Sequence, residues 1–163
     1  MLQTENPQDR FMNLHLEFVE QFKSVNSDMK TLYALPHKFI EDNASAIDQF
    51  LATASIPGAP ESFDRSVKGV KDFLYQIEDF KYQTMELFFE HRSYSDKCVE
   101  YLRRSQEIRK SNLSGIKSTK MLNGLMEELT ALRFGLTRLR EKGGEMMIQL
   151  KTIQGKWQNI KSN

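Results

Sequence analysis

Apolar residues recur at alternating steps of three and four from Leu122 to Ile160. This spacing keeps their side chains on one face of an α-helix, and such a long apolar seam is typical of helices that pack along other helices. We therefore predict a helix over about residues 118–161, with Ser118 as its N-cap. The seam positions are Leu122, Leu125, Leu129, Leu132, Leu136, Leu139, Gly143, Met146, Leu150, Ile153, Trp157 and Ile160.

A second apolar face runs through the N-terminal third of the chain. Asn6, Pro7 and Asp9 form a helix-start signal, because Asn caps the first turn, proline fits the first helical position and an acid suits the helix dipole. We predict a helix over about residues 7–55. Pro36 lacks an N–H and clashes with the preceding turn, so we expect a kink or a break there. The face consists of Phe11, Leu14, Phe18, Phe22, Val25, Met29, Leu32, Ile40, Ile47, Leu51 and Ala54.

The middle of the chain predicts a further helix over about residues 61–113. Two prolines and a glycine within residues 57–60 end the first helix. A step of three from Ile77 to Phe80, where four is due, predicts a stammer that overwinds the supercoil. The polar segment that begins at Ser93 predicts a second place where the helix could break. Its seam is Phe63, Val67, Val70, Leu74, Ile77, Phe80, Thr84, Leu87, His91, Tyr94, Cys98, Tyr101, Ser105 and Ile108.

Three helices of similar length with short connections must pack with neighbours antiparallel. We predict an all-α fold: one domain over residues 1–163 that forms an elongated antiparallel bundle of three long helices with coiled-coil-like packing. A full break at Pro36 or Ser93 would give a four- or five-helix version. Ser114 and Gly115 mark the second turn.

The net charge of +1 conceals an asymmetry along the chain. Residues 1–90 contain 8 Lys or Arg against 15 Asp or Glu, a net charge of −7, whereas residues 91–163 contain 15 against 7, a net charge of +8. The two halves therefore carry opposite electrostatic fields.

The cysteine count and hydropathy indicate a compartment. Cys98 is the single cysteine, so no internal disulfide can form and a reducing environment is favoured. The first residues contain no apolar segment typical of a secretory signal, and no apolar run is long enough to span a membrane. We expect a cytoplasmic protein.

Residues that could carry chemistry are few and scattered. His15, His37 and His91 lack the Glu-x-x-His spacing of metal-binding bundles, and no phosphate loop, zinc-protease or nucleophile motif occurs. We predict no catalytic residues, no metal, no cofactor and no small-molecule substrate, and therefore no enzyme. Nucleic-acid binding is also not expected, because the basic residues lack interleaved aromatics and the total charge is nearly zero.

Two features on the predicted seams have alternative interpretations. His91 could sense pH inside the bundle, or it could be a largely buried neutral side chain bonded to a neighbour. Gly143 and Gly144 each cost about 1 kcal/mol relative to alanine within a helix. Either a neighbouring helix packs unusually close against them, or the helix bends there.

The first candidate interaction site is a basic tip. Its residues straddle the second predicted turn, and antiparallel helices would gather them at one end of the bundle, where they could attract phosphates or acidic protein. The alternative is an ordinary solvated helix end. The six residues are Arg103, Arg104, Arg109, Lys110, Lys117 and Lys120.

The second candidate site comprises Phe134 and Ile148. Both occupy the heptad position that faces away from the seam, two heptads apart. Exposed apolar residues there would indicate a self-association face. The alternative is that the N-terminal helix covers them.

These features favour a non-enzymatic helical scaffold or adaptor that binds other proteins, with itself as a homodimer among the partners. The alternative function is a peripheral membrane-binding module that uses the basic tip on anionic lipids. The predicted plan resembles the architecture of spectrin-like spacers and of BAR-type membrane modules, although the chain contains no diagnostic motif of either.

Overall fold

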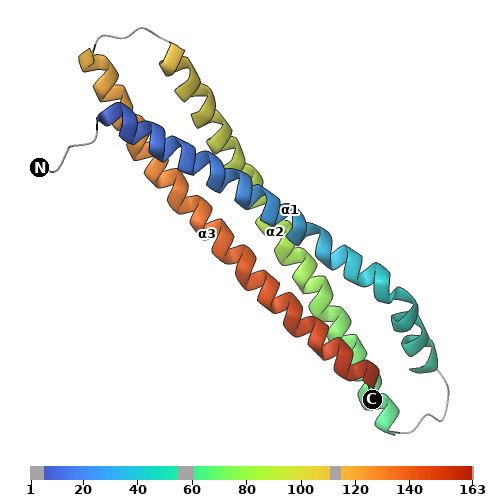
Figure 1. The fold of residues 1–163 in the computed structure, drawn as a ribbon. Helices are drawn as coiled ribbons and strands as arrows, with labels where there is room; N and C mark the ends of the chain where they lie inside the picture. Colours follow the sequence, from blue (N-terminus) through green and yellow to red (C-terminus); the bar gives the residue numbers. More distant parts are fainter. Residues whose placement is uncertain (1–5, 55–60, 111–114, 163) are drawn as a thin grey trace, which may run out of the picture. The chain divides into compact units, whose positions relative to one another are not determined.

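The computed structural model describes residues 6–54, 61–110 and 115–162. From Pro7 onward the described residues form three helices, α1 (Pro7–Ala54), α2 (Glu61–Lys110) and α3 (Gly115–Ser162), which pack against one another (Figure 1). The prediction of an all-α fold with three long helices is confirmed.

The predicted start of α1 is confirmed and that of α3 is wrong. The Asn6 side chain accepts a hydrogen bond from the Gln8 amide at 3.0 Å, which is the N-cap geometry that the sequence indicated. α3 begins at Gly115, so Ser118 lies within the helix and not at its N-cap. Ser114 lies outside the described residues.

The helices contribute to two compact units. Unit 1 comprises Met1–Asp28 and Phe89–Glu141, and unit 2 comprises Met29–Phe88 and Lys142–Asn163. Each unit contains a part of all three helices, and the two are described separately. The single domain over residues 1–163 stays a prediction.

In unit 1, α2 runs antiparallel to the other two helices. His15 of α1 contacts Tyr101 of α2, and the later α1 residue Asn26 contacts the earlier α2 residue His91. The ion pairs Glu17–Arg133 and Asp28–Arg140 show that α1 and α3 run parallel. The core comprises Phe11, Phe18, Val25, Cys98, Tyr101, Leu122, Leu125, Leu129, Leu132, Leu136 and Leu139.

In unit 2, α2 again runs antiparallel to α1, because Tyr33 contacts Phe88 and the later α1 residue Phe39 contacts the earlier α2 residue Phe73. The Trp157 indole of α3 stacks on Phe73 of α2 with ring centroids 4.9 Å apart, and its N–H donates to the Asn43 side chain of α1 at 2.9 Å. The three helices therefore meet at one fully buried tryptophan. The core comprises Met29, Leu32, Ile47, Val70, Phe73, Ile77, Phe80, Leu87, Met146, Leu150, Ile153 and Trp157.

The seam predicted for α3 is confirmed along its length. Every position from Leu122 to Trp157 is buried, including Gly143, and Ile160 is half-buried. Of the seam positions predicted for α1 and α2, the side chains of Leu51, Ala54, Phe63 and Val67 lie outside the described residues.

The seam of α2 needs one correction. Phe73 is buried, with 2% of its surface exposed, whereas the predicted Leu74 is only half-buried. The prediction of a stammer is therefore wrong, because the buried residues alternate in steps of three and four from Val70 through Phe80. Phe73 is drawn inward because it packs against both Trp157 and Phe39.

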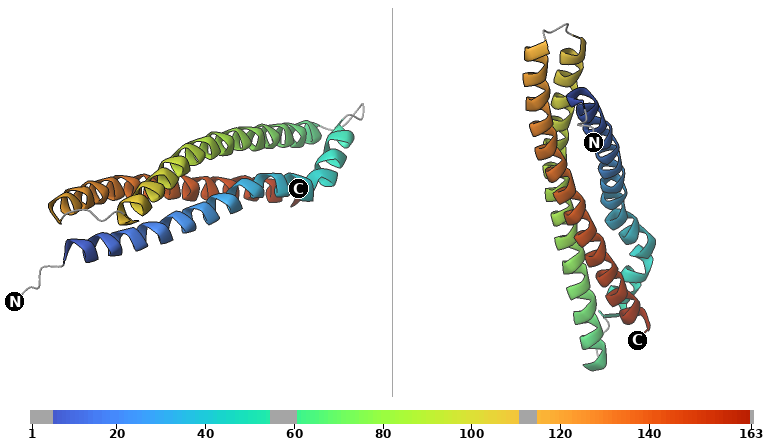
Figure 2. Two further views of the ribbon diagram at one scale, coloured as in Figure 1. Left: turned by 90° about the horizontal axis from the view of Figure 1, so that it is seen from above. Right: turned by 60° about the vertical axis from the view of Figure 1, so that its left-hand side comes forward.

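The predicted break at Pro36 is wrong, because α1 is continuous through that residue. Proline removes only the hydrogen bond to the Leu32 carbonyl. Burial of Leu32 and of Pro36 itself holds the segment in place. The helix does bend within its final third (Figure 2), where the Asn43 side chain donates to the Phe39 carbonyl at 2.8 Å.

The predicted break near Ser93 is also wrong. α2 remains helical through this position, because the seam residues on either side, Leu87 and Cys98, are both buried.

Two glycines of α3 allow close contact with a neighbouring helix. The Tyr94 phenol lies directly over Gly135, and its hydroxyl donates to the carbonyls of Ala131 and Leu132 at 3.1 and 3.0 Å. A Cβ at Gly143 would lie 2.9 Å from the Met29 methyl carbon. Close packing thus explains Gly143. Gly144 has nothing within 4 Å of its missing side chain and no such explanation.

We predict opposite effects for two alanine substitutions in unit 1. Gly135→Ala should destabilise the fold by about 1–2 kcal/mol, because the methyl group would overlap the Tyr94 ring and displace its hydroxyl from the carbonyls. Gly124→Ala, the matched control, should stabilise it by about 0.5–1 kcal/mol, because nothing lies within 4 Å. Urea denaturation measures both, and equal effects would contradict the close contact.

The buried pair His15–Tyr101 predicts a pH dependence. His15 Nδ1 lies 3.1 Å from the Tyr101 hydroxyl, and burial, with a smaller contribution from Arg109, lowers the pKa of the imidazole. Since the folded pKa lies below the ordinary value of about 6.5, the unfolded chain takes up the proton first as pH falls. This contribution to stability should therefore be present above pH about 6.5 and be lost as pH falls toward the folded pKa.

Denaturation at a series of pH values should show a smaller acid-induced loss for His15→Gln than for the wild type. The control His37→Gln, at a side chain that is 77% exposed, should keep the wild-type profile. A His15→Gln profile parallel to that of the wild type would contradict the prediction.

Candidate functional site

The structure places acidic side chains within the basic tip. Arg103 lies between two carboxylates of α2, with Nη2 2.6 Å from Glu100 Oε1 and Nη1 2.7 Å from Glu107 Oε1. These carboxylates raise the pKa of Arg103, and Arg103 lowers the pKa of Glu100. The charge of this arginine is thus locally compensated.

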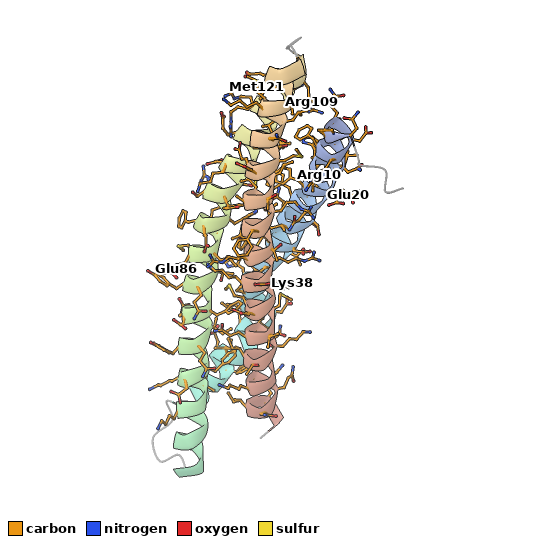
Figure 3. All side chains as sticks on the ribbon, turned by 90° about the vertical axis from the view of Figure 1, so that its left-hand side faces the viewer. Arg10, Glu20, Lys38, Glu86, Arg109 and Met121 are labelled. Carbon is orange, nitrogen blue, oxygen red and sulfur yellow. The ribbon has the colours of Figure 1, made fainter. Side chains whose placement is uncertain are left out.

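The remaining tip residues belong to the same unit but have different surroundings. Arg104 pairs with Glu128 of α3, and Arg109 Nε donates to the Ser105 carbonyl at 3.4 Å. Lys110 and Lys120 are exposed, whereas the Lys117 side chain lies outside the described residues. Figure 3 labels Arg109 and Met121 at the end of unit 1 where α2 ends and α3 begins.

Phe134 and Ile148 are exposed in their respective units, with 68% and 67% of their surfaces accessible. The alternative that the N-terminal helix covers them is therefore wrong. Phe134 belongs to unit 1 and Ile148 to unit 2. Their role in self-association stays a prediction.

The three histidines contact different partners. His15 contacts Tyr101, His37 lies 3.7 Å from Glu41 Oε1, and His91 Nε2 lies 2.7 Å from the Asn26 side-chain oxygen. His91 is half-buried, and this burial lowers its pKa. This agrees with the interpretation of His91 as a neutral side chain bonded to a neighbour.

Burial also raises the pKa of the Cys98 thiol, to about 12. Within the described ranges, no three His, Cys, Asp or Glu side chains cluster as a metal ion would require.

Sequence reasoning missed an apolar surface on the outside of α2 in unit 2. It comprises Tyr75, Tyr82, Met85 and Phe88, with 75%, 62%, 54% and 40% of their surfaces exposed. We call these four residues the α2 surface. Large exposed apolar residues that lie close together commonly mark a contact site.

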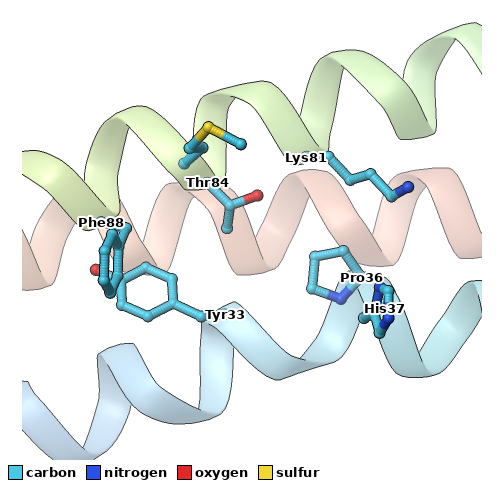
Figure 4. A pocket seen from close by; sticks show the side chains of 7 residues that line it. Tyr33, Pro36, His37, Lys81, Thr84 and Phe88 are labelled. Atoms are coloured by element: carbon cyan, nitrogen blue, oxygen red, sulfur yellow. The ribbon is translucent and has the colours of Figure 1, made fainter.

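A groove adjoins the α2 surface and contains two of its members. It has a volume of about 360 Å³ and lies between α1 and α2 (Figure 4). The Tyr33 and Phe88 rings meet edge to face, with centroids 5.2 Å apart. The groove is lined by Tyr33, Pro36 and His37 of α1 and by Lys81, Thr84, Met85 and Phe88 of α2.

A row of acids lies beside the α2 surface. Asp72, Asp79 and Glu86 are exposed and seven residues apart, the same interval that separates Tyr75 from Tyr82. Each acid lies three or four positions from one of the tyrosines, so the acids and tyrosines are neighbours on the helix surface. We call the three residues the acidic row. The seven-residue repeat of these two rows was the sequence signal that could have revealed the surface.

The described part of the chain contains no helix with a stretch apolar and long enough to cross a bilayer. Comparison of the chain with protein-family models, curated proteins and solved structures finds no match.

The ion pairs of the basic tip predict how acid neutralisation should affect membrane binding. If the tip binds anionic lipid, Glu100→Gln/Glu107→Gln should strengthen binding several-fold, because Arg103 is released and each basic group near the surface is worth about 1 kcal/mol. Co-sedimentation with phosphatidylserine vesicles measures this. The control Glu141→Gln/Glu145→Gln makes the same change in charge away from Arg103. Absence of binding by both the wild type and Glu100→Gln/Glu107→Gln at low salt would contradict membrane binding by the tip.

Proposed function

We propose that this protein is a non-enzymatic helical scaffold or adaptor that binds other proteins through apolar side chains on the outside of its helices. The observation that carries the proposal is the α2 surface, with four large apolar residues exposed along α2. Unit 2 already has a core formed by all three helices, so these residues are not needed to complete it.

The composition of the α2 surface supports a contact with protein. Tyrosine, phenylalanine and methionine are enriched at protein interfaces, where they bury much area with few rotatable bonds or adapt to an irregular partner. The adjoining groove between α1 and α2 provides the concave part of such a site. Amphipathic helices commonly bind in grooves of this kind.

The membrane-binding alternative has less support. It depends on the summed charge of the basic tip, and carboxylates of Glu100, Glu107 and Glu128 lie against two of its arginines. The lone, buried cysteine favours a reducing compartment, and our proposal places the protein in the cytoplasm.

Two matched double variants test the proposal. Tyr82→Ser/Met85→Ser removes two exposed apolar side chains from the α2 surface, and Phe134→Ser/Ile148→Ser removes two of similar exposure from α3. All four positions are exposed, so each substitution should cost little stability. Proteins captured by the wild type from a cell extract should be purified and their affinities for all three forms measured by calorimetry.

We expect the α2 variant to bind a captured partner about tenfold or more weakly than the wild type does, because burying two such side chains contributes a few kcal/mol to the binding free energy. The α3 variant should bind as the wild type does. The reverse result would assign binding to Phe134 and Ile148. Unchanged affinity in both variants would contradict binding through exposed apolar residues.

Sedimentation velocity of the wild type shows separately whether a second copy is a partner.

A further inference from the structure

We propose that the α2 surface binds a basic amphipathic helix of a partner protein, with apolar residues of that helix against the tyrosines and the groove and its Lys or Arg residues against the acidic row. This inference rests on the proposed function and specifies the chemistry of the partner.

The spacing of the exposed tyrosines favours a helical partner. Tyr75 and Tyr82 are separated by seven residues, the repeat at which two packed helices present successive side chains to each other. Met85 and Phe88 continue the exposed face toward the groove. A groove of about 360 Å³ is at the small end of the range for ligand pockets and suits one or two side chains anchored from a helix outside.

The charges beside the tyrosines favour a basic partner. On the side of the tyrosines away from the groove, the acidic row presents three carboxylates, and Lys68, four positions before Asp72, is the one basic residue of α2 that lies three or four positions from any of them. Lys81, at the groove, is the one basic residue of α2 between positions 72 and 88, and it already pairs with Glu78 at 3.3 Å. His37, on the α1 side, lies beside Glu41.

Lys71 lies four positions before Tyr75, and Lys156 of α3 lines a second groove together with Asp72. The negative charge is therefore least compensated beside Tyr82, which has Asp79 and Glu86 on either side, so a basic helix is attracted there and an acidic one repelled. Figure 4 shows Lys81 and His37 at one end of the groove and the Tyr33 and Phe88 rings at the other. An incoming helix can thus place apolar side chains between these two ends.

A second copy of this chain matches the surface less well. Phe134 has one charged residue three or four positions away, Arg138, and Ile148 has Glu145 as well as Lys151. Neither position provides the uniform row of positive charge that would complement the acidic row. The surroundings of Phe134 and Ile148 therefore do not complement the acidic row, and the occupant we propose is a different protein.

Selection from a peptide display library tests the inference. Each peptide is a helix of about four heptads with fixed leucines at the apolar positions, and its flanking positions are randomised among Lys, Glu and Gln. The immobilised full chain should enrich peptides with lysine at the flanking positions. These should bind about tenfold more tightly than their glutamine counterparts, and the difference should shrink as salt is raised.

Charge reversal of the acidic row provides the decisive variant. Asp72→Lys/Asp79→Lys/Glu86→Lys should invert the selection and enrich glutamate peptides. The matched control Glu127→Lys/Glu141→Lys/Glu145→Lys makes the same change in total charge at exposed positions of α3 and should still enrich lysine peptides. Circular dichroism confirms that both variants keep their helical content.

The possible results separate this inference from the proposed function. Enrichment on the wild type without a preference for lysine would overturn the basic partner and leave a protein-binding surface. If the α3 control variant also enriched glutamate peptides, the basic partner would be overturned too, because the total charge of the chain would then be enough to explain the selection.

If sedimentation velocity showed that the wild type self-associates through Tyr82 and Met85, a second copy of the chain would occupy the α2 surface, and this inference would be wrong. If no peptide of any charge is enriched on the wild type relative to Tyr82→Ser/Met85→Ser, both the basic partner and the α2 surface as a binding site are wrong.

Discussion

Each helix of this protein has one apolar seam, and none can bury that seam without the other two. The buried tryptophan of unit 2 shows the constraint in one place. Trp157 stacks on Phe73 of α2 and donates its indole N–H to Asn43 of α1, so one side chain ties three helices together and leaves no polar atom of its own unpaired. In unit 1, Tyr101 has a similar place, packed edge to face on Phe18 and bonded to His15.

Close helix contact follows from the same constraint. Tyr94 can reach two carbonyls of α3 because Gly135 has no side chain in its way, and Met29 packs against Gly143 for the same reason. Glycine within a helix normally costs about 1 kcal/mol, and these two positions recover that cost through contact with a neighbour. The buried residues of α2 continue past Ser93 and those of α1 past Pro36, which explains why both helices remain continuous.

With the seams filled, the outer faces are available for other molecules. The two candidate surfaces differ in how their charges are arranged. At the basic tip, glutamates of α2 and α3 lie against Arg103 and Arg104 and reduce the field that a distant anion would experience. Beside the α2 surface, Asp79 and Glu86 lie on either side of Tyr82, with no basic residue of α2 three or four positions from either carboxylate. We therefore propose the α2 surface, rather than the basic tip, as the place of specific recognition.

Local and periodic signals in the sequence determined the helices, because a helix depends mainly on the spacing of its apolar residues and on the capping residues at its ends. The N-cap at Asn6 and the entire seam of α3 could be predicted in this way. Only the tertiary structure decided between neighbouring candidates. Phe73 and Leu74 both lie near the seam of α2, and contact with Trp157 and Phe39 selected Phe73.

The sites depended on tertiary structure for a similar reason. Glu128 is far from Arg104 in the sequence, so their ion pair requires two helices to meet. Besides its buried seam, α2 has Tyr75 and Tyr82 at the same seven-residue interval, and periodicity alone does not distinguish apolar residues that face the core from those that face solvent. Packing buried Ile77 and left Tyr82 exposed, because three helices can enclose only one face of each.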